Sequence, residues 1–170
     1  IIHCPLDITA LFSLSGGVPL AKRAEQRKIY RMMELERWKE ILKIPINFSP
    51  KYFPPSNIII PSCMVLALQN EEDQNKLAHK LFECIWAEEK DIGDNDTLKE
   101  ACLQCGINFE KLLESQKNFF GKYHNLATLA AEKNIFGSPS YVLDDEIFWG
   151  QDRLNLLERS IQKKIVTKVE

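Results

Sequence analysis

The chain has 170 residues, of which 45% are hydrophobic and 27% charged, as is typical of one soluble globular domain with or without an insertion. A formal net charge of −2 gives no reason to expect binding to nucleic acids or to anionic membranes. No apolar run approaches the roughly 18 residues that a membrane-spanning helix needs, so no membrane partner is expected.

The five cysteines lack the spacing of a disulfide framework, which favours a reducing compartment. We therefore expect the cytoplasm, or an organelle matrix if the source is eukaryotic. No signal peptide is visible, although a segment upstream of Ile1 would not be seen in this chain.

The first nine residues alternate between apolar and polar side chains, which predicts a strand over 1–9. Pro5 places this strand at a sheet edge or at a bulge, because proline cannot donate a ladder hydrogen bond. Residues 11–17 (LFSLSGG) are expected to form a loop.

Residues 20–43 predict one long helix with Leu35, Trp38 and Leu42 on one face. A proline-rich connection follows, and then a series of shorter helices. These are predicted over 60–69 and 73–88, from Asp94 or Asp96 to Cys105, from Asn108 onward, and over 123–133. Helix hairpins between strand-forming segments are typical of an all-helical insertion, here 20–122, into a domain made of 1–19 and 123–170.

Cys102 and Cys105 form a CxxC motif, which in redox domains opens a helix so that its N-terminus stabilises a thiolate. Here the motif lies late in a predicted helix that Gly106 ends, where the helix dipole disfavours a thiolate. We expect these cysteines to pack in a core. We also expect no metal site, and no Ser/His/Asp or Cys/His catalytic set can be assigned.

The stretch 134–157 (NIFGSPSYVLDDEIFWGQDRLNLL) has the most informative order of elements. Gly137-Ser138-Pro139 interrupts the chain, and strands are predicted at 140–143 and 147–149 around an Asp144-Asp145 hairpin turn. Gly150 to Asp152 ends the second strand, and a helix is predicted over 153–163. This order resembles the end of a thioredoxin-type domain, in which a proline in cis precedes a strand.

Two features of this stretch make it a candidate site. A cis bond before Pro139 would leave the backbone N–H and C=O of Ser138 free to pair with an extended peptide. Asp152 could cap the last helix while turning one carboxylate oxygen outward, toward an ammonium group. The alternative is that Pro139 only marks a loop and that Asp152 is only a helix cap.

The run FGSPSYVLDDEIFWGQDRL resembles the C-terminal signature of the glutathione-dependent 2-hydroxychromene-2-carboxylate isomerases, which are relatives of the kappa-class glutathione transferases. Residues 30–38 (YRMMELERW) resemble a second family motif, YMLRDLQRW. The resemblance implies an α/β, thioredoxin-like domain with a helical insertion. It also implies an isomerase whose glutathione cofactor adds its thiolate reversibly to an aromatic hydroxychromene carboxylate or a related unsaturated keto acid.

The resemblance implies roles for seven residues. The glutathione-binding residues would be Ser138, Pro139, Gln151 and Asp152, and the substrate-binding residues would be Arg27, Lys28 and Trp149. For any one cation on the predicted helix, a solvated helix face is the simpler interpretation.

The family's first strand, first helix and key serine have no counterpart here when 1–9 is matched to the family's second strand. The catalytic residue is therefore unknown, and we expect either a segment before Ile1 or a partner chain to complete the sheet. A kappa-like glutathione transferase and a non-catalytic thioredoxin-fold binding protein are the alternatives, and a homodimer is left open.

Overall fold

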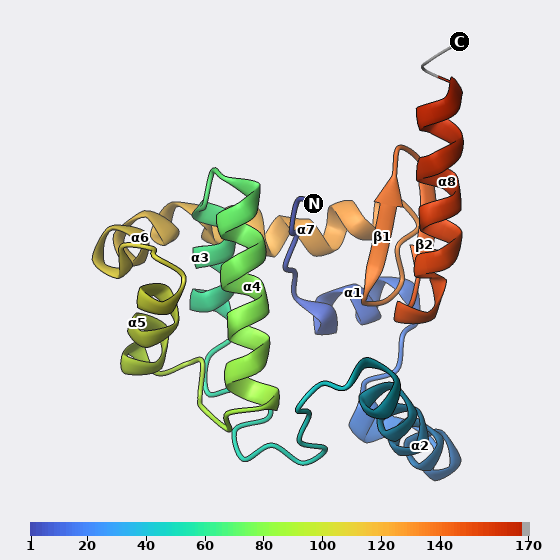
Figure 1. The fold of residues 1–170 in the computed structure, drawn as a ribbon, viewed down its shortest axis with the longest axis horizontal. Coiled ribbons are helices and arrows are strands. Elements are labelled where there is room, and N and C mark those ends of the chain that lie inside the picture. Colours follow the sequence, from blue (N-terminus) through green and yellow to red (C-terminus); the bar gives the residue numbers. More distant parts are fainter. Residues whose placement is uncertain (168–170) are drawn as a thin grey trace. The chain divides into compact units, whose positions relative to one another are not determined.

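The computed structural model describes residues 1–167, and it divides into two compact units. The first unit comprises Ile1–Leu6 and Leu20–Leu126, and the second comprises Asp7–Pro19 and Ala127–Glu170 (Figure 1). The domain bounds predicted above, and their assignment to a thioredoxin-like part and an insertion, stay a prediction.

The first unit is built from helices. After the 3-10 turn Leu20–Lys22 come α2 (Glu25–Leu42), α3 (Ile59–Ala67), α4 (Glu71–Trp86), α5 (Asn95–Gln104), α6 (Phe109–Ser115) and the 3-10 turn Gln116–Phe119. Helix α7 (Phe120–Glu132) begins in this unit and ends in the second. The single helix predicted over 20–43 is therefore wrong at its start, because the backbone forms a separate 3-10 turn before Ala24 begins α2.

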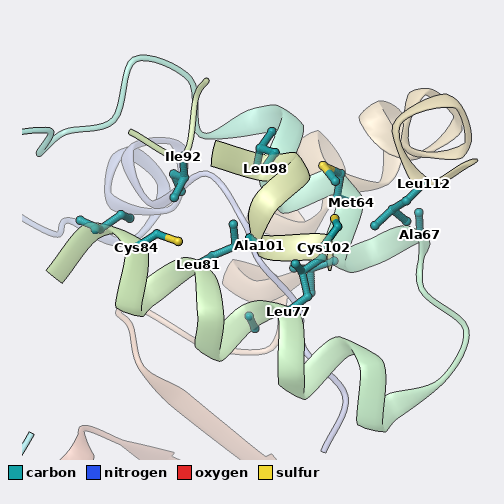
Figure 2. Close-up of a cluster of buried hydrophobic side chains, with 13 residues drawn as sticks. Met64, Ala67, Leu77, Leu81, Cys84, Ile92, Leu98, Ala101, Cys102 and Leu112 are labelled. Carbon is teal, nitrogen blue, oxygen red and sulfur yellow. The ribbon is translucent and has the colours of Figure 1, made fainter. Parts of the chain in front are cut away.

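The core of the first unit lies between α3, α4 and α5. Leu77 and Leu81 of α4 face Leu98 and Cys102 of α5, as Figure 2 shows. Helix α3 is buried along most of its length, which its apolar composition predicts. The predicted face of α2 is only partly buried, because Leu42 is exposed and no residue of the helix is fully buried.

Side-chain caps begin three of these helices. The carboxylate of Asp94 accepts a hydrogen bond from the N–H of Thr97, and the amide oxygen of Asn108 accepts one from the N–H of Lys111. The cap at Asn108 was predicted, and Asp94 is one of the two residues at which the sequence placed the start of α5. Asn70 caps α4 in the same way. Each cap satisfies N–H groups that the helix itself leaves without a partner.

The proline-rich connection between α2 and α3 is tied to the segment that follows α4. The N–H of Asn47 donates to the carbonyl oxygen of Trp86 at 2.6 Å, and the N–H of Ser56 donates to Asp91 Oδ1 at 3.1 Å. Residues 44–58 are therefore held against the end of α4 and the segment that follows it.

The second unit begins with a helix where a strand and a loop were predicted. Helix α1 (Ile8–Ser15) starts because Asp7 Oδ1 accepts hydrogen bonds from the N–H groups of Thr9 and Ala10, at 2.9 and 3.1 Å. It ends at Gly16, whose φ of 75° suits a left-handed C-cap. The strand over 1–9 and the loop over 11–17 are both wrong, since a local cap outweighed a short alternating pattern.

The rest of the second unit follows the predicted order. Strand β1 (Ser140–Leu143) pairs antiparallel with β2 (Glu146–Trp149), and Leu143 lies opposite Glu146 across a two-residue turn. Asp144 has a φ of 56°, as the first residue of such a turn requires. A 3-10 turn (Gln151–Arg153) leads into α8 (Leu154–Thr167), which packs against both strands (Figure 1). Within residues 1–167, no helix combines the length and the hydrophobicity needed to cross a bilayer.

Candidate functional site

The turn that leads into β1 holds the backbone groups of the candidate site. The Ser138–Pro139 peptide bond is cis. Ser140 Oγ donates to the carbonyl oxygen of Gly137 at 2.7 Å and so closes the turn on itself. Within residues 1–167 neither the N–H nor the C=O of Ser138 takes part in a hydrogen bond. The turn therefore offers one donor and one acceptor to an extended ligand.

Gly150 connects this turn to the acidic side of the site. Its N–H donates to the carbonyl oxygen of Pro139 at 2.9 Å, which continues the β1–β2 ladder by one pair. Its φ of 106° and ψ of 150° are open essentially to glycine alone. A Cβ at this position would lie 2.5 Å from Asp152 Oδ1, so the carboxylate rests directly against the glycine. Pro139 and Asp152 are thus held at the same end of the hairpin.

Asp152 does not cap the last helix as predicted. It lies inside the 3-10 turn Gln151–Arg153, whose N-cap is Gly150, and α8 begins only at Leu154. Its Oδ2 accepts a hydrogen bond from the Arg153 guanidinium at 2.6 Å, and both side chains are about half exposed. Because this ion pair is open to water, it costs little to exchange Arg153 for a ligand ammonium group.

Trp149 and Gln151, two further residues of the predicted site, precede and follow Gly150 in the sequence. Gln151 is exposed in the same 3-10 turn, and Trp149 ends β2 with its indole half exposed. The predicted residues Ser138, Pro139, Trp149, Gln151 and Asp152 therefore belong to one unit and to one end of one hairpin.

Arg27 and Lys28 lie in the first turn of α2, which belongs to the other unit. Lys28 Nζ lies 3.4 Å from Glu25 Oε2, and Arg27 is exposed. Their role as substrate-binding cations stays a prediction.

The CxxC motif lies at the C-terminal end of α5, as expected. Cys102 is fully buried, and burial raises the pKa of its thiol to about 12. Burial also raises the pKa of Cys105, which is the C-cap residue. Neither thiol is ionised at neutral pH, so the motif lacks the thiolate that disulfide exchange needs. Within the described part of the chain, no three or more His, Cys, Asp or Glu side chains gather closely enough to hold a metal ion.

The sequence analysis missed three residues that shape this site. Ser140 closes the turn, Gly150 positions the carboxylate, and Gly137 has no room for a side chain because a Cβ there would lie 2.5 Å from Trp149 Nε1. The glycines were visible in the FGSP and FWGQD runs, but their close neighbours depend on the hairpin register, which a sequence does not display.

Comparison with known proteins places this geometry in context. The sequence matches the family described as DSBA-like thioredoxin domain over residues 1–162. A 2-hydroxychromene-2-carboxylate isomerase of Sphingobium xenophagum is 29% identical over 157 residues, which cover 91% of this chain and 78% of the relative. Proteins of the same name from Pseudomonas putida and from Pseudomonas sp. (strain C18) are 26% and 25% identical and are covered over 76% and 61% of their lengths, against 92% and 78% of this chain.

A solved structure shares the fold. The selenomethionine form of a 2-hydroxychromene-2-carboxylate isomerase superposes with a TM-score of 0.78 over 96% of this chain and 80% of its own, at 22% sequence identity. The thioredoxin-like fold with a large helical part, predicted from the sequence, is therefore confirmed, and so is the resemblance on which that prediction rested.

Proposed function

Because the chain belongs to the DSBA-like thioredoxin domain family, and because its curated relatives carry the name of an isomerase, we propose that it is an isomerase that uses bound glutathione as a cofactor. Its substrate would be a hydroxychromene carboxylate or a related unsaturated aromatic keto acid. The relatives' names support the reaction class, and the hairpin end described above supports the cofactor.

The proposal is carried by one observation: within residues 1–167 the Ser138 backbone groups form no hydrogen bond, and they lie at the same end of the hairpin as the Asp152 carboxylate. Ser138 offers a free N–H and C=O beside cis-Pro139, and the Pro139 carbonyl is bonded to Gly150, against which the Asp152 carboxylate rests. A thiol tripeptide has an amide backbone to pair with Ser138 and an ammonium group to replace Arg153 at Asp152. The donors and acceptors on the chain therefore fit glutathione.

Each residue has a definite task in this proposal. Ser138 would orient the cysteinyl unit by strand-like pairing, and Pro139 would keep that edge of the turn open. Asp152 would hold the γ-glutamyl ammonium, and Gln151 would supply a neutral hydrogen-bonding amide beside it. Arg27 and Lys28 would bind carboxylates, and Trp149 would form a wall of the substrate site.

When bound, glutathione would supply a thiolate that adds reversibly to an electrophilic carbon of the substrate. The addition would turn a carbon–carbon double bond into a single bond, about which the substrate could rotate once its ring had opened. The chain's contribution is to fix the tripeptide in one pose and thereby to lower the entropic cost of the encounter. Because addition is followed by elimination, glutathione is not consumed.

A turnover assay with substoichiometric glutathione tests this proposal. The substrate would be 2-hydroxychromene-2-carboxylate, followed by its change in ultraviolet absorbance. We expect more moles of product than of glutathione, and no acceleration when S-methylglutathione replaces glutathione, since the blocked sulfur cannot add. Consumption of one mole of glutathione per mole of substrate would indicate a transferase. No turnover with either glutathione or S-methylglutathione would indicate a non-catalytic binding protein. Both outcomes contradict the proposal.

A further inference from the structure

Two aromatic side chains stand on either side of the cis-proline turn in the sequence and meet in the structure. The rings of Phe136 and Trp149 have centroids 4.8 Å apart and planes inclined by 60°, an edge-to-face arrangement. Even in mutual contact, they remain 46% and 49% exposed. Aromatic side chains that are already ordered, yet half in water, gain free energy if a further apolar group covers them.

The hairpin register shows which side chains share a face of the hairpin with Trp149. Trp149 lies opposite Ser140, and the next pair on the same face is Val142 with Ile147. Val142 is also exposed, at 45%, whereas Phe148 on the opposite face is buried. The indole therefore ends an apolar strip on the uncovered face of the hairpin.

Gly137 fixes the edge of the indole. A Cβ at Gly137 would lie 2.5 Å from Trp149 Nε1 and 3.1 Å from Trp149 Cε2, so the indole edge lies directly on the glycine backbone. The indole is thus confined by Gly137 along one edge and by the Phe136 ring beside it. A ring held in this way does not lose much side-chain entropy when a ligand binds to it.

We propose that Phe136 and Trp149 form an aromatic platform that binds the planar ring of the substrate, with Phe136 as a specificity-determining residue and Gly137 as a positioning residue. This inference rests on the proposed function, because the platform adjoins Ser138 and would present an aromatic substrate to the same turn. The platform selects a flat aromatic ring over a saturated ring of similar size, since only an aromatic ring gains stacking or edge-to-face interactions with Phe136 and Trp149 beyond the burial of apolar area.

Nuclear magnetic resonance of the indole N–H groups tests the platform in the absence of glutathione. The chain has three tryptophans, so the indole signals can be assigned by single substitution of Trp38, Trp86 and Trp149. We expect added 2-naphthoate to shift the Trp149 signal saturably and to leave the other two in place. Cyclohexanecarboxylate, which has the charge but not the flat ring, should shift the Trp149 signal much less.

Variants identify the parts of the platform. Phe136→Ala should weaken 2-naphthoate binding by roughly two- to tenfold, the range expected for one aromatic contact, and Phe136→Tyr should restore it. Gly137→Ala should move the Trp149 signal before any ligand is added. Phe82→Ala is the matched control, because Phe82 is an exposed phenylalanine of α4 in the other unit.

Three results would overturn the platform. They are an unmoved Trp149 signal, equal shifts with both carboxylates, or unchanged affinity in Phe136→Ala. Since glutathione is absent throughout, these outcomes differ from the failure of glutathione to support turnover. That failure would overturn the proposed function, and with it the assignment of the platform to the substrate, whereas the binding of a flat ring at Phe136 and Trp149 would still be measurable.

Discussion

Gly150 is the residue on which the two halves of the candidate site depend. It accepts a conformation with φ of 106° and at the same time allows the Asp152 carboxylate to lie against it. Any side chain would meet both restrictions. Pro139 and Asp152 both contact this glycine, Pro139 through its carbonyl oxygen and Asp152 through its carboxylate. Neither contact can be read from the sequence.

Substituting Gly150 should therefore be costly. Gly150→Ala would strain the backbone and place a Cβ 2.5 Å from Asp152 Oδ1, so we expect the free energy of unfolding to fall by about 1–3 kcal/mol. Urea unfolding followed by circular dichroism measures the change. Gly121→Ala is the control, since a Cβ there meets nothing within 4 Å and the residue lies in α7; it should be neutral or slightly stabilising. Equal effects of the two substitutions would contradict this account of Gly150.

At the scale of the elements, local chemistry decided where the sequence prediction held and where it did not. The hairpin was predictable, because Asp144-Asp145 is a turn signal between two short apolar runs. The caps at Asp94 and Asn108 were predictable for the same reason, since one side chain sets each boundary. The strand over 1–9 was wrong, because Asp7 begins a helix inside it and four alternating positions are too few to outweigh a cap.

The partly buried face of α2 shows a different limit. The periodicity of Leu35, Trp38 and Leu42 is correct for a helix, but it does not tell how much of the stripe finds a partner. Periodicity fixes which side chains share a face, whereas burial depends on distant segments. The contacts of Gly137 with Trp149 could not be predicted for the same reason.

Ion pairs fasten the end of α4 to α5, and this arrangement predicts a pH dependence. Glu88 is hydrogen bonded to Lys80, whose side chain is only 13% exposed, and lies 3.0 Å from Lys90. Lys90 in turn pairs with Glu100 of α5 at 2.8 Å. The hydrogen bonds from Lys80 and Lys90 hold the pKa of Glu88 below its ordinary value, in spite of partial burial, which acts in the opposite direction.

A lowered pKa in the folded state means that the ionised Glu88 stabilises the fold. The contribution is complete above the unfolded-state pKa of about 4.3 and disappears as the pH falls through the lower folded-state value. Glu88→Gln should therefore cost about 1–2 kcal/mol at neutral pH, with the difference from the wild type shrinking at pH values below about 4.

Urea unfolding at a series of pH values measures this difference. Glu114→Gln serves as the control, since Glu114 and Lys117 form an ion pair in which both side chains are exposed. This substitution should change stability by less than about 0.5 kcal/mol at any pH. A Glu88→Gln effect that is independent of pH would show that the ion pairs are not its cause.

At the scale of the whole molecule, the chain joins a helical unit with a solvent-excluded core to a unit that carries the hairpin end. The CxxC motif belongs to the core of the helical unit, where burial keeps the Cys102 thiol protonated. The groups suited to hold a tripeptide belong to the hairpin end instead. The two CxxC thiols are therefore not suited to be the reactive sulfur, and the proposed function assigns that role to bound glutathione.

The central claim is that the hairpin end of the second unit binds glutathione through Ser138 and Asp152, and isothermal titration calorimetry with glutathione tests it most directly. We predict saturable binding by the wild type and binding weakened by roughly tenfold or more in Asp152→Ala, because a charge-assisted hydrogen bond is lost. Asp145→Ala, which removes the same charge from the turn at the other end of the hairpin, should bind like the wild type. Absence of binding by the wild type, or equal affinities of the three proteins, would contradict the account.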